Sequence, residues 1–471
     1  MSIKSCLIWA RTLFSRWVKA PEYVYIVIAL VSVVGFVFIT PPFQGPDEPS
    51  HYIRTQYIAH GYFVPIDVQS SSASLPSSID RVLHGTFYRD DLRGNTTDKY
   101  ELFRTKSALK QPFNTGETYK PTMISYSPLP YLPAIPGVVL ANLLNLSPLV
   151  SMYIARLSLG VASILLLFFA IRLIPHKKYL FVVVGLVPML LFQQAMITVD
   201  SVSYALLALF ISYVLYLREN KIIRKEQWFI LGVICLSIIL AKPLVYLFLP
   251  LILLLLSKKN ALKWIASITT ICVVILLGWL AVSSIKTVAT PAASLPDNVN
   301  SQQQLEMLLS HPKRALRIGW NSYMTTYGDD ETRGVVGVFG AADTVYPLWM
   351  FTGYAILLGV LCVIDIDSRR SKQIKLAWKI LAVILCVGYF VAVNIALYLA
   401  YTPVNFNIIY GVQGRYFLPI LIISAAVVFT GGIRTTKADT LKVKRWSVFA
   451  MIILVFLALF ITFQRYYLYT P

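Results

Sequence analysis

The chain has 471 residues, of which 57% are hydrophobic, and its 42 Lys and Arg against 22 Asp and Glu give a formal net charge of +20. Many apolar runs reach the roughly 20 residues that a helix needs to cross a bilayer, so the composition excludes an ordinary soluble protein. The basic residues fall in short clusters between these runs, which argues against a nucleic-acid partner and for membrane lipids as the surroundings.

The apolar runs predict an all-α, polytopic membrane helix bundle of about 11 spans (10–13), built as a single integral-membrane domain over residues 1–471. Five cysteines show neither a disulfide framework nor a metal-binding spacing. The predicted spans cover residues 21–40, 150–172, 179–198, 201–217, 227–241, 243–257, 263–284, 345–364, 376–400, 415–433 and 446–464.

The basic clusters predict the orientation of these spans. A leader with Lys4, Arg11, Arg16 and Lys19 precedes the first span, which we expect to remain uncleaved. A cytoplasmic N-terminus places this leader and the other dense basic clusters on the cytoplasmic side, as the positive-inside rule requires. The odd number of spans then puts the two termini on opposite sides of the membrane.

This orientation leaves two large outer segments, residues 41–149 and 285–344, and an outer turn at 402–414. The proline-rich segment 129–146 is predicted to be half-inserted, because a full crossing would put the next basic cluster outside. By the same argument, 227–257 is predicted to form two short helices that turn at Lys242-Pro243. A polar stretch, Ser70 to Ser78, is expected to be a loop with short helices on either side.

An acidic pair follows the first span within the sequence Pro46-Asp47-Glu48. We expect a helix to begin at Pro46, with both carboxylates in its first turn and His51 on the same side as Asp47. One interpretation is simple capping of a helix N-terminus. The alternative is a functional carboxylate, because the flanking prolines would hold it rigidly at a fixed depth beside the bundle.

Three cations are predicted at the same outer level: Arg156 in the second span, Lys242 at a helix turn, and Arg415 in the motif 411–416, which also holds Gln413 and Tyr416. Charged side chains at membrane depth usually face a cavity and mark a functional path. Together they indicate a site for an anionic headgroup, whereas snorkelling to the surface is the alternative for each. Asp200 is either an ion-pair partner of these cations or a helix N-cap.

A carboxylate above cations suits the transfer of a sugar from a lipid-linked phosphate to a hydroxyl. The phosphate leaves without needing a proton, so it requires only positive charge to stabilise it. One base then removes the proton of the attacking hydroxyl, and direct displacement inverts the anomeric carbon. Glycosidases, by contrast, need two carboxyl groups.

The layout of the chain resembles the GT-C superfamily of integral-membrane glycosyltransferases. More narrowly, PPFQGPDEPSHY (41–52) and GVQGRYFLP (411–419) resemble the signatures of a bacterial membrane-protein family within it, marked by an N-terminal Pro-Asp-Glu motif. The resemblance implies a polyprenyl-phosphate sugar donor at the outer face, with Asp47 as base and Glu48 as the alternative base. Arg415 and Tyr416 would then lie near the donor phosphate.

Some members of that superfamily bind a divalent cation through an Asp-x-Asp type site. This chain has only the adjacent pair Asp47-Glu48 and Asp90-Asp91. Mg²⁺ or Mn²⁺ therefore stays an open alternative as cofactor.

The sequence thus predicts a glycosyltransferase of a bacterial cytoplasmic membrane that modifies a glycan or glycolipid acceptor on the outer side. Two rivals remain. A lipid-linked glycan translocase would also place cations at membrane depth. A ligase or polymerase of lipid-linked glycans would place its key residues, such as Arg314, in the late loop 285–344.

Overall fold

The computed structural model describes residues 20–65, 71–86, 99–286, 298–326, 330–340, 344–365, 373–431, 433–434 and 437–468. Most of these residues are helical, which confirms the predicted helix-rich membrane architecture, and the span count stays a prediction. The basic leader and Asp90-Asp91 lie outside the described residues.

Six described helices are long and apolar enough to cross a membrane. They are α2 (Pro21–Ile39), α7 (Pro148–Leu173), α10 (Val199–Glu219), α12 (Ala261–Lys286), α17 (Leu376–Tyr401) and α19 (Lys437–Tyr467). Shorter segments lie among them: α8 (Lys178–Gly185), α9 (Pro188–Gln194), α11 (Lys225–Ala241), the 3₁₀ helix η2 (Val245–Leu255), α16 (Leu348–Val363), η3 (Gly414–Phe417), α18 (Leu418–Ile423) and the π-helical turn η4 (Ser424–Val428).

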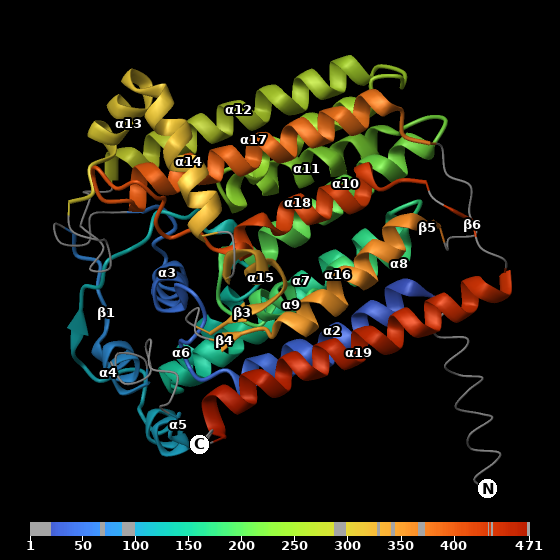
Figure 1. Ribbon diagram of the computed structural model, residues 1–471. Helices are drawn as coiled ribbons and strands as arrows, with labels where there is room; N and C mark the ends of the chain where they lie inside the picture. The colour runs from blue at the N-terminus through green and yellow to red at the C-terminus, as the bar shows by residue number, and fades with distance from the viewer. Residues whose placement is uncertain are drawn as a thin grey trace, which may run out of the picture.

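The remaining elements gather at one end of the bundle, which we call the loop end (Figure 1). They are α3 (Glu48–Ala59), α4 (Ser77–Thr86), α5 (Leu102–Leu109), η1 (Leu129–Tyr131), α6 (Ile135–Leu143), α13 (Ser301–Ser310), α14 (Pro312–Thr326) and α15 (Asp330–Gly337). The last helix, α19, also ends here, where the backbone N–H of Tyr100 donates to the carbonyl of Tyr466 at 2.8 Å.

Strands in the described part of the chain form three short ladders of two strands each. Antiparallel pairs join β1 (Leu75–Pro76) to β2 (Thr118–Tyr119) and β3 (Val338–Phe339) to β4 (Thr344–Val345), and β5 (Ile364–Asp365) pairs in parallel with β6 (Ile433–Arg434). The first ladder corrects the prediction of a plain loop at Ser70 to Ser78, because β1 and the start of α4 fall within that stretch.

Two predicted spans are not single helices. The run 415–433 consists of η3, α18 and η4, which together end at Val428. The run 179–198 is divided into α8 and α9, because Val187 is extended and Pro188 begins a new helix. Proline disfavours helical backbone at the residue before it, which explains the break. The run 227–257 instead matches its prediction, since α11 ends beside Lys242, and Leu244 turns with a φ of +69° into η2.

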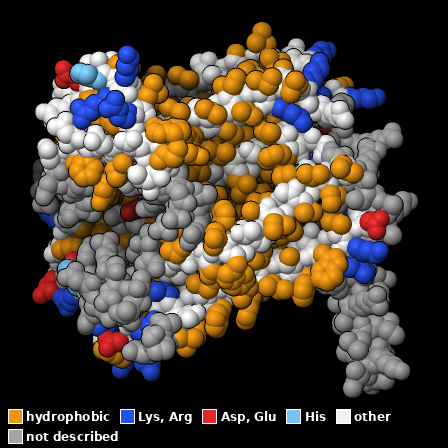
Figure 2. All heavy atoms as spheres, in the orientation of Figure 1, with side chains coloured by type: hydrophobic (Ala, Val, Ile, Leu, Met, Phe, Trp, Pro, Cys, Tyr) orange, Lys and Arg blue, Asp and Glu red, His pale blue; other side chains and the backbone are white. Residues whose placement is uncertain are grey.

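The helix α10 lies at the centre of the bundle. In its most apolar stretch 89% of the residues are buried, against 17% for α12 and 28% for α17. The exposed side chains of α12 and α17 are mostly apolar, and Figure 2 shows a broad hydrophobic band with Lys and Arg gathered towards its ends. This band is the surface that a bilayer covers.

The end of the bundle opposite the loop end holds Lys177 and Lys258, which belong to two of the basic clusters that the positive-inside rule assigns to the cytoplasmic side. Lys177 donates to the carbonyls of Leu361, Cys362 and Ile364 at the end of α16. Lys258 likewise donates to carbonyls at the end of α10. Cations are favoured at helix C-termini, where the last carbonyls lack intrahelical partners, so these lysines also stabilise the helix ends.

Candidate active site

Asp47 occupies the turn that leads from α2 into α3. Its backbone is left-handed, with a φ of +57°, and α3 begins at Glu48, two residues later than predicted. The Asp47 side chain makes no capping hydrogen bond to the helix and is 59% exposed. Its carboxylate oxygen Oδ2 instead accepts from Nη2 of Arg415 at 2.8 Å. The capping interpretation therefore does not describe Asp47.

Arg415 lies on the 3₁₀ turn η3, more than 360 residues further along the chain. Its guanidinium is buried and held on three sides. Nε donates to Oε1 of Gln413 at 2.7 Å, and Nη2 donates to Asp47. The guanidinium carbon Cζ lies 5.0 Å from the centre of the Tyr416 ring. The sequence predicted Arg415 and Tyr416 near a donor phosphate, with Gln413 as a supporting residue, and the structure brings these three side chains together.

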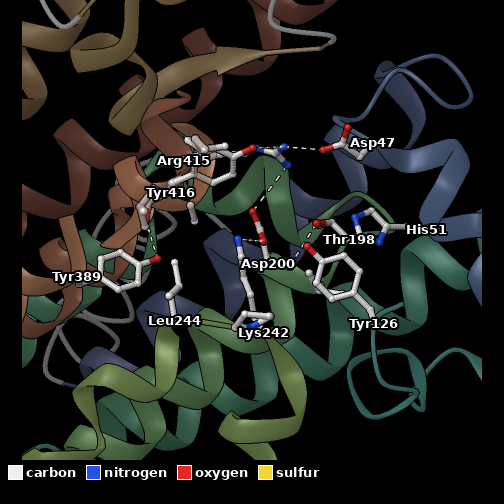
Figure 3. Close-up of a pocket in the computed structure, with 15 residues that line it drawn as sticks. Asp47, His51, Tyr126, Thr198, Asp200, Lys242, Leu244, Tyr389, Arg415 and Tyr416 are labelled. Carbon is white, nitrogen blue, oxygen red and sulfur yellow. Dashed lines mark hydrogen bonds and ion pairs between the residues drawn. The ribbon is translucent and has the colours of Figure 1, made fainter. Parts of the chain in front are cut away.

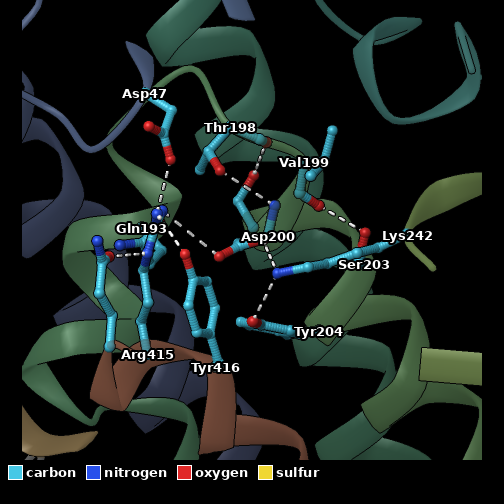
Figure 4. Close-up of polar contacts among 12 residues, drawn as sticks. Asp47, Gln193, Thr198, Val199, Asp200, Ser203, Tyr204, Lys242, Arg415 and Tyr416 are labelled. Atoms are coloured by element: carbon cyan, nitrogen blue, oxygen red, sulfur yellow. Dashed lines mark hydrogen bonds and ion pairs between the residues drawn. The ribbon is translucent and has the colours of Figure 1, made fainter. Parts of the chain in front are cut away.

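Asp200 joins the second predicted cation to the same site (Figure 4). Its Oδ1 accepts from Nζ of Lys242, and its Oδ2 lies 3.7 Å from Nη1 of Arg415. Lys242 also donates to the hydroxyl of Tyr204 at 3.1 Å. The hydroxyl of Thr198, not Asp200, caps α10, so Asp200 takes the ion-pair role of its two predicted alternatives.

These side chains surround one pocket at the loop end, with a volume of about 200 Å³ (Figure 3). One wall is polar and comes from α3, the start of α10, the α11–η2 turn and η3. The other wall is largely apolar and comes from α17 and from Leu244, which precedes η2. The described lining residues are Asp47, His51, Tyr126, Thr198, Val199, Asp200, Lys242, Pro243, Leu244, Tyr389, Val393, Ala396, Leu397, Arg415 and Tyr416.

The electrostatics of the pocket keep Asp47 ionised and His51 neutral at neutral pH. Partial desolvation by the surrounding protein raises the pKa of the Asp47 carboxyl, but the positive charge of Arg415 more than offsets this, so the pKa lies below its usual value. Burial lowers the pKa of His51 to about 4. The His51 ring is fixed by a hydrogen bond of 2.6 Å between Nδ1 and the hydroxyl of Tyr131.

Glu48 and Arg156 do not enter this pocket, which corrects two predicted site residues. Both side chains are fully buried, and they form a bidentate ion pair of 2.6 and 2.7 Å. The Arg156 guanidinium also donates to the carbonyls of Val37, Thr40 and Pro41, so all five of its N–H groups are used.

Glu48 is equally saturated. Besides Arg156, its oxygens accept from the backbone N–H groups of Ile197 and Gly45, at 3.0 and 3.1 Å. A carboxylate with every acceptor position filled is not available as a base. The pair instead ties the end of α2 and the start of α3 to α7 and to the segment before α10.

A family model matches residues 30–424, which make up most of the chain and include every residue that lines the pocket. The chain belongs to the family described as Predicted membrane protein (DUF2142). No curated protein and no solved structure matches it. The family description agrees with the multi-pass architecture, and the chemistry must be argued from the pocket.

Several pocket residues of this DUF2142 protein escaped the sequence reasoning. Tyr126 stands beside the proline-flanked motif at 127–131, so its neighbourhood offered a signal. Tyr389 offered none, because it lies within the uniformly apolar run of α17. It packs at 5.1 Å from Phe248, and its hydroxyl donates to the carbonyl of Tyr416 at 3.0 Å.

The sequence left a divalent cation open as a cofactor, and the donor set of the pocket bears on this possibility. Among the described residues there is no group of three or more His, Cys, Asp or Glu side chains placed to hold a metal ion. The two pocket carboxylates, Asp47 and Asp200, each already face a cation. A metal between them would have to draw both away from Lys242 and Arg415.

Proposed function

We propose that this protein is an integral-membrane glycosyltransferase that moves a sugar from a polyprenyl-phosphate donor to a hydroxyl of a glycan or glycolipid, at the outer face of the membrane. The observation that carries the proposal is the pocket itself. It combines an exposed carboxylate, Asp47, with a buried cation, Arg415, at the end of a membrane bundle. The GT-C resemblance of the two sequence motifs points to the same chemistry.

The two unlike walls of the pocket fit an amphiphilic donor. A phosphate headgroup would lie against Arg415, because the guanidinium offers paired N–H donors to phosphate oxygens. The lipid chain would follow the apolar wall formed by Leu244, Val393 and Leu397. A water-soluble sugar donor would have no use for such a wall, so the pocket favours a lipid-linked one.

The charges of the pocket are balanced before any ligand binds. Asp47 and Asp200 carry two negative charges, and Lys242 and Arg415 carry two positive ones. The buried Asp200 stays with Lys242, whereas Asp47 is the partner nearest to solvent. An incoming phosphate would therefore take the place of Asp47 on Arg415. This exchange frees the carboxylate at the moment when the donor arrives.

The proposed reaction follows from that exchange. Asp47 takes the proton of the acceptor hydroxyl, and the hydroxyl oxygen forms a bond to the anomeric carbon of the donor sugar. The bond between that carbon and the phosphate oxygen breaks, and the phosphate leaves with the electron pair and pairs with Arg415. Direct displacement inverts the anomeric configuration. No second carboxyl group is needed.

The test compares lipid-linked sugars and surface glycans in cells that carry the wild-type protein, no protein, or the Asp47→Asn variant. We expect the variant to match the deletion, with accumulated donor beside an under-decorated polymer, while the protein still folds. Unchanged profiles in the deletion strain would contradict the proposal. Arg314→Ala is the matched control, because the ligase or polymerase alternative assigns the essential cation to loop 285–344.

The structure offers no specific observation in favour of that alternative. None of the described residues that line the pocket comes from 285–344. Arg314 instead donates to the carbonyl of Asn405 at 3.5 Å, in the chain segment that leads to Arg415. A loss of transfer in Arg314→Ala, with Asp47→Asn active, would nevertheless reverse the assignment.

A further inference from the structure

The helices α13 and α14 form a hairpin that joins at His311, and α14 has two unlike faces. Ile318 and Ser322 are buried on one face. On the other face Leu316 is 76% exposed and Trp320 is 59% exposed, and Tyr323 continues this row. Residues three and four positions apart lie on one side of a helix, so these side chains form a continuous apolar stripe. The pocket does not use this stripe.

Basic side chains border the stripe. Lys313 and Arg317 are exposed and lie one turn apart on α14. The neighbouring α13 adds exposed Leu309. In Figure 2, Lys, Arg and His side chains and hydrophobic side chains share the region of this hairpin. Aromatic and aliphatic residues beside Lys and Arg are the composition of helices that lie in the plane of a membrane interface.

The location of the hairpin matches that composition. It lies at the loop end beside the ends of α12 and α17 (Figure 1). Ser301 of α13 donates to the carbonyl of Leu399 near the end of α17 at 2.8 Å. The outward side chains of α17, such as Val391 and Ile395, are apolar and exposed, as membrane-facing residues are. The stripe on α14 therefore continues the lipid-covered surface at its edge.

The buried face of α14 holds the chain segment that leads to Arg415. The hydroxyl of Ser322 accepts from the backbone N–H of Ile409 at 2.8 Å. Asn321 donates to the carbonyl of Asn407 at 3.4 Å. The same helix thus faces the membrane edge on one side and fixes segment 402–411 on the other.

We propose that α14 docks on the lipid surface at the loop end, with its apolar stripe among the acyl chains and Lys313 and Arg317 on anionic lipid headgroups. The attraction is electrostatic as well as apolar, so the docked state is favoured by anionic lipid. Docking steadies segment 402–411 and, through it, the position of Arg415. The inference concerns the membrane surface and holds whether or not the pocket transfers a sugar.

The experiment uses the full chain in nanodiscs of phosphatidylcholine, with or without phosphatidylglycerol, and measures hydrogen exchange at Ile409 and Tyr410. We expect phosphatidylglycerol to slow this exchange by about tenfold to thirtyfold, because two basic side chains act at the charged surface. Lys313→Gln/Arg317→Gln should abolish the difference. The matched control, Lys106→Gln/Lys110→Gln in α5 and its C-cap, removes the same charge at the same end of the bundle. This control should retain the effect of phosphatidylglycerol.

A second measurement tests insertion of the apolar stripe without relying on the charges. The chain has nine tryptophans, so the contribution of Trp320 is isolated by comparison with Trp320→Phe. We expect brominated phosphatidylcholine to quench the emission that Trp320→Phe loses. The proposal would be overturned if aqueous iodide quenched that emission instead. It would also be overturned if hydrogen exchange at Ile409 in the wild type did not change with phosphatidylglycerol.

Discussion

Two adjacent carboxylates, Asp47 and Glu48, have opposite surroundings in this protein. Glu48 is fully buried, and every acceptor position of its carboxylate is filled by Arg156 and two backbone N–H groups. Asp47 is more than half exposed and meets Arg415 through a single oxygen. An ion pair with no unused hydrogen-bonding positions therefore holds the fold, whereas one with unused positions at a pocket mouth is free to exchange partners.

The largest expected effect comes from breaking the buried pair. Arg156→Leu should destabilise the protein by about 3–5 kcal/mol, because it leaves the Glu48 carboxylate buried and unpaired. Thermal unfolding of the purified protein in detergent measures the loss. The double variant Glu48→Leu/Arg156→Leu should recover only part of that stability. It removes the lone charge, but the five backbone groups that the pair had bonded lose these partners. Equal stability of the single variant and the wild type would refute the structural role.

Breaking the exposed pair should act on chemistry rather than on stability. Asp47→Asn should lower the transfer rate by about 10²–10⁴-fold, the usual contribution of a general base. Because the pair is exposed on the Asp47 side, the free energy of unfolding should change by no more than about 1 kcal/mol. Rates of donor consumption and unfolding curves of the same preparation check both. If the variant unfolds readily, Asp47 has a structural role like that of Glu48.

The neutral His51 beside Asp47 predicts a pH effect. Burial lowers the pKa of His51 from 6.5 to about 4 in the folded protein, so the unfolded chain binds a proton first as the pH falls. Stability is complete above pH 6.5 and declines by about 3 kcal/mol between pH 6.5 and 4. Across this window, the free energy of unfolding should depend less steeply on pH in His51→Gln than in the wild type. An identical slope in both proteins would show that His51 is not neutral when folded.

The pair of Asp200 and Lys242 should show an intermediate response, because Asp200 also lies 3.7 Å from Arg415. Lys242→Met should cost about 1–3 kcal/mol by leaving a buried carboxylate without its hydrogen bond. Adding Asp200→Asn should restore part of this loss, and a double-mutant cycle of unfolding free energies measures the coupling. Purely additive losses would show that the two side chains act separately.

The sequence predicted the helical membrane character, the turn at Lys242-Pro243 and the proximity of Asp47, Lys242 and Arg415. Hydropathy and basic clusters carry these predictions, since a bilayer imposes the same requirement on every span. It did not foresee that 179–198 divides into two helices, although Pro188 was a visible signal. Nor did it separate Asp47 from Glu48, because neighbouring residues at a helix start share one sequence context.

By itself, the sequence determined where polar groups interrupt the apolar runs, because an unpaired charge inside a bilayer is too costly to occur without a role. Only the tertiary structure decided which cation meets which carboxylate. Arg156 and Arg415 look equivalent in the sequence, yet α2 and α7 enclose the first, and the turn η3 directs the second into the pocket. Packing between distant helices set this difference, and no local pattern encodes it.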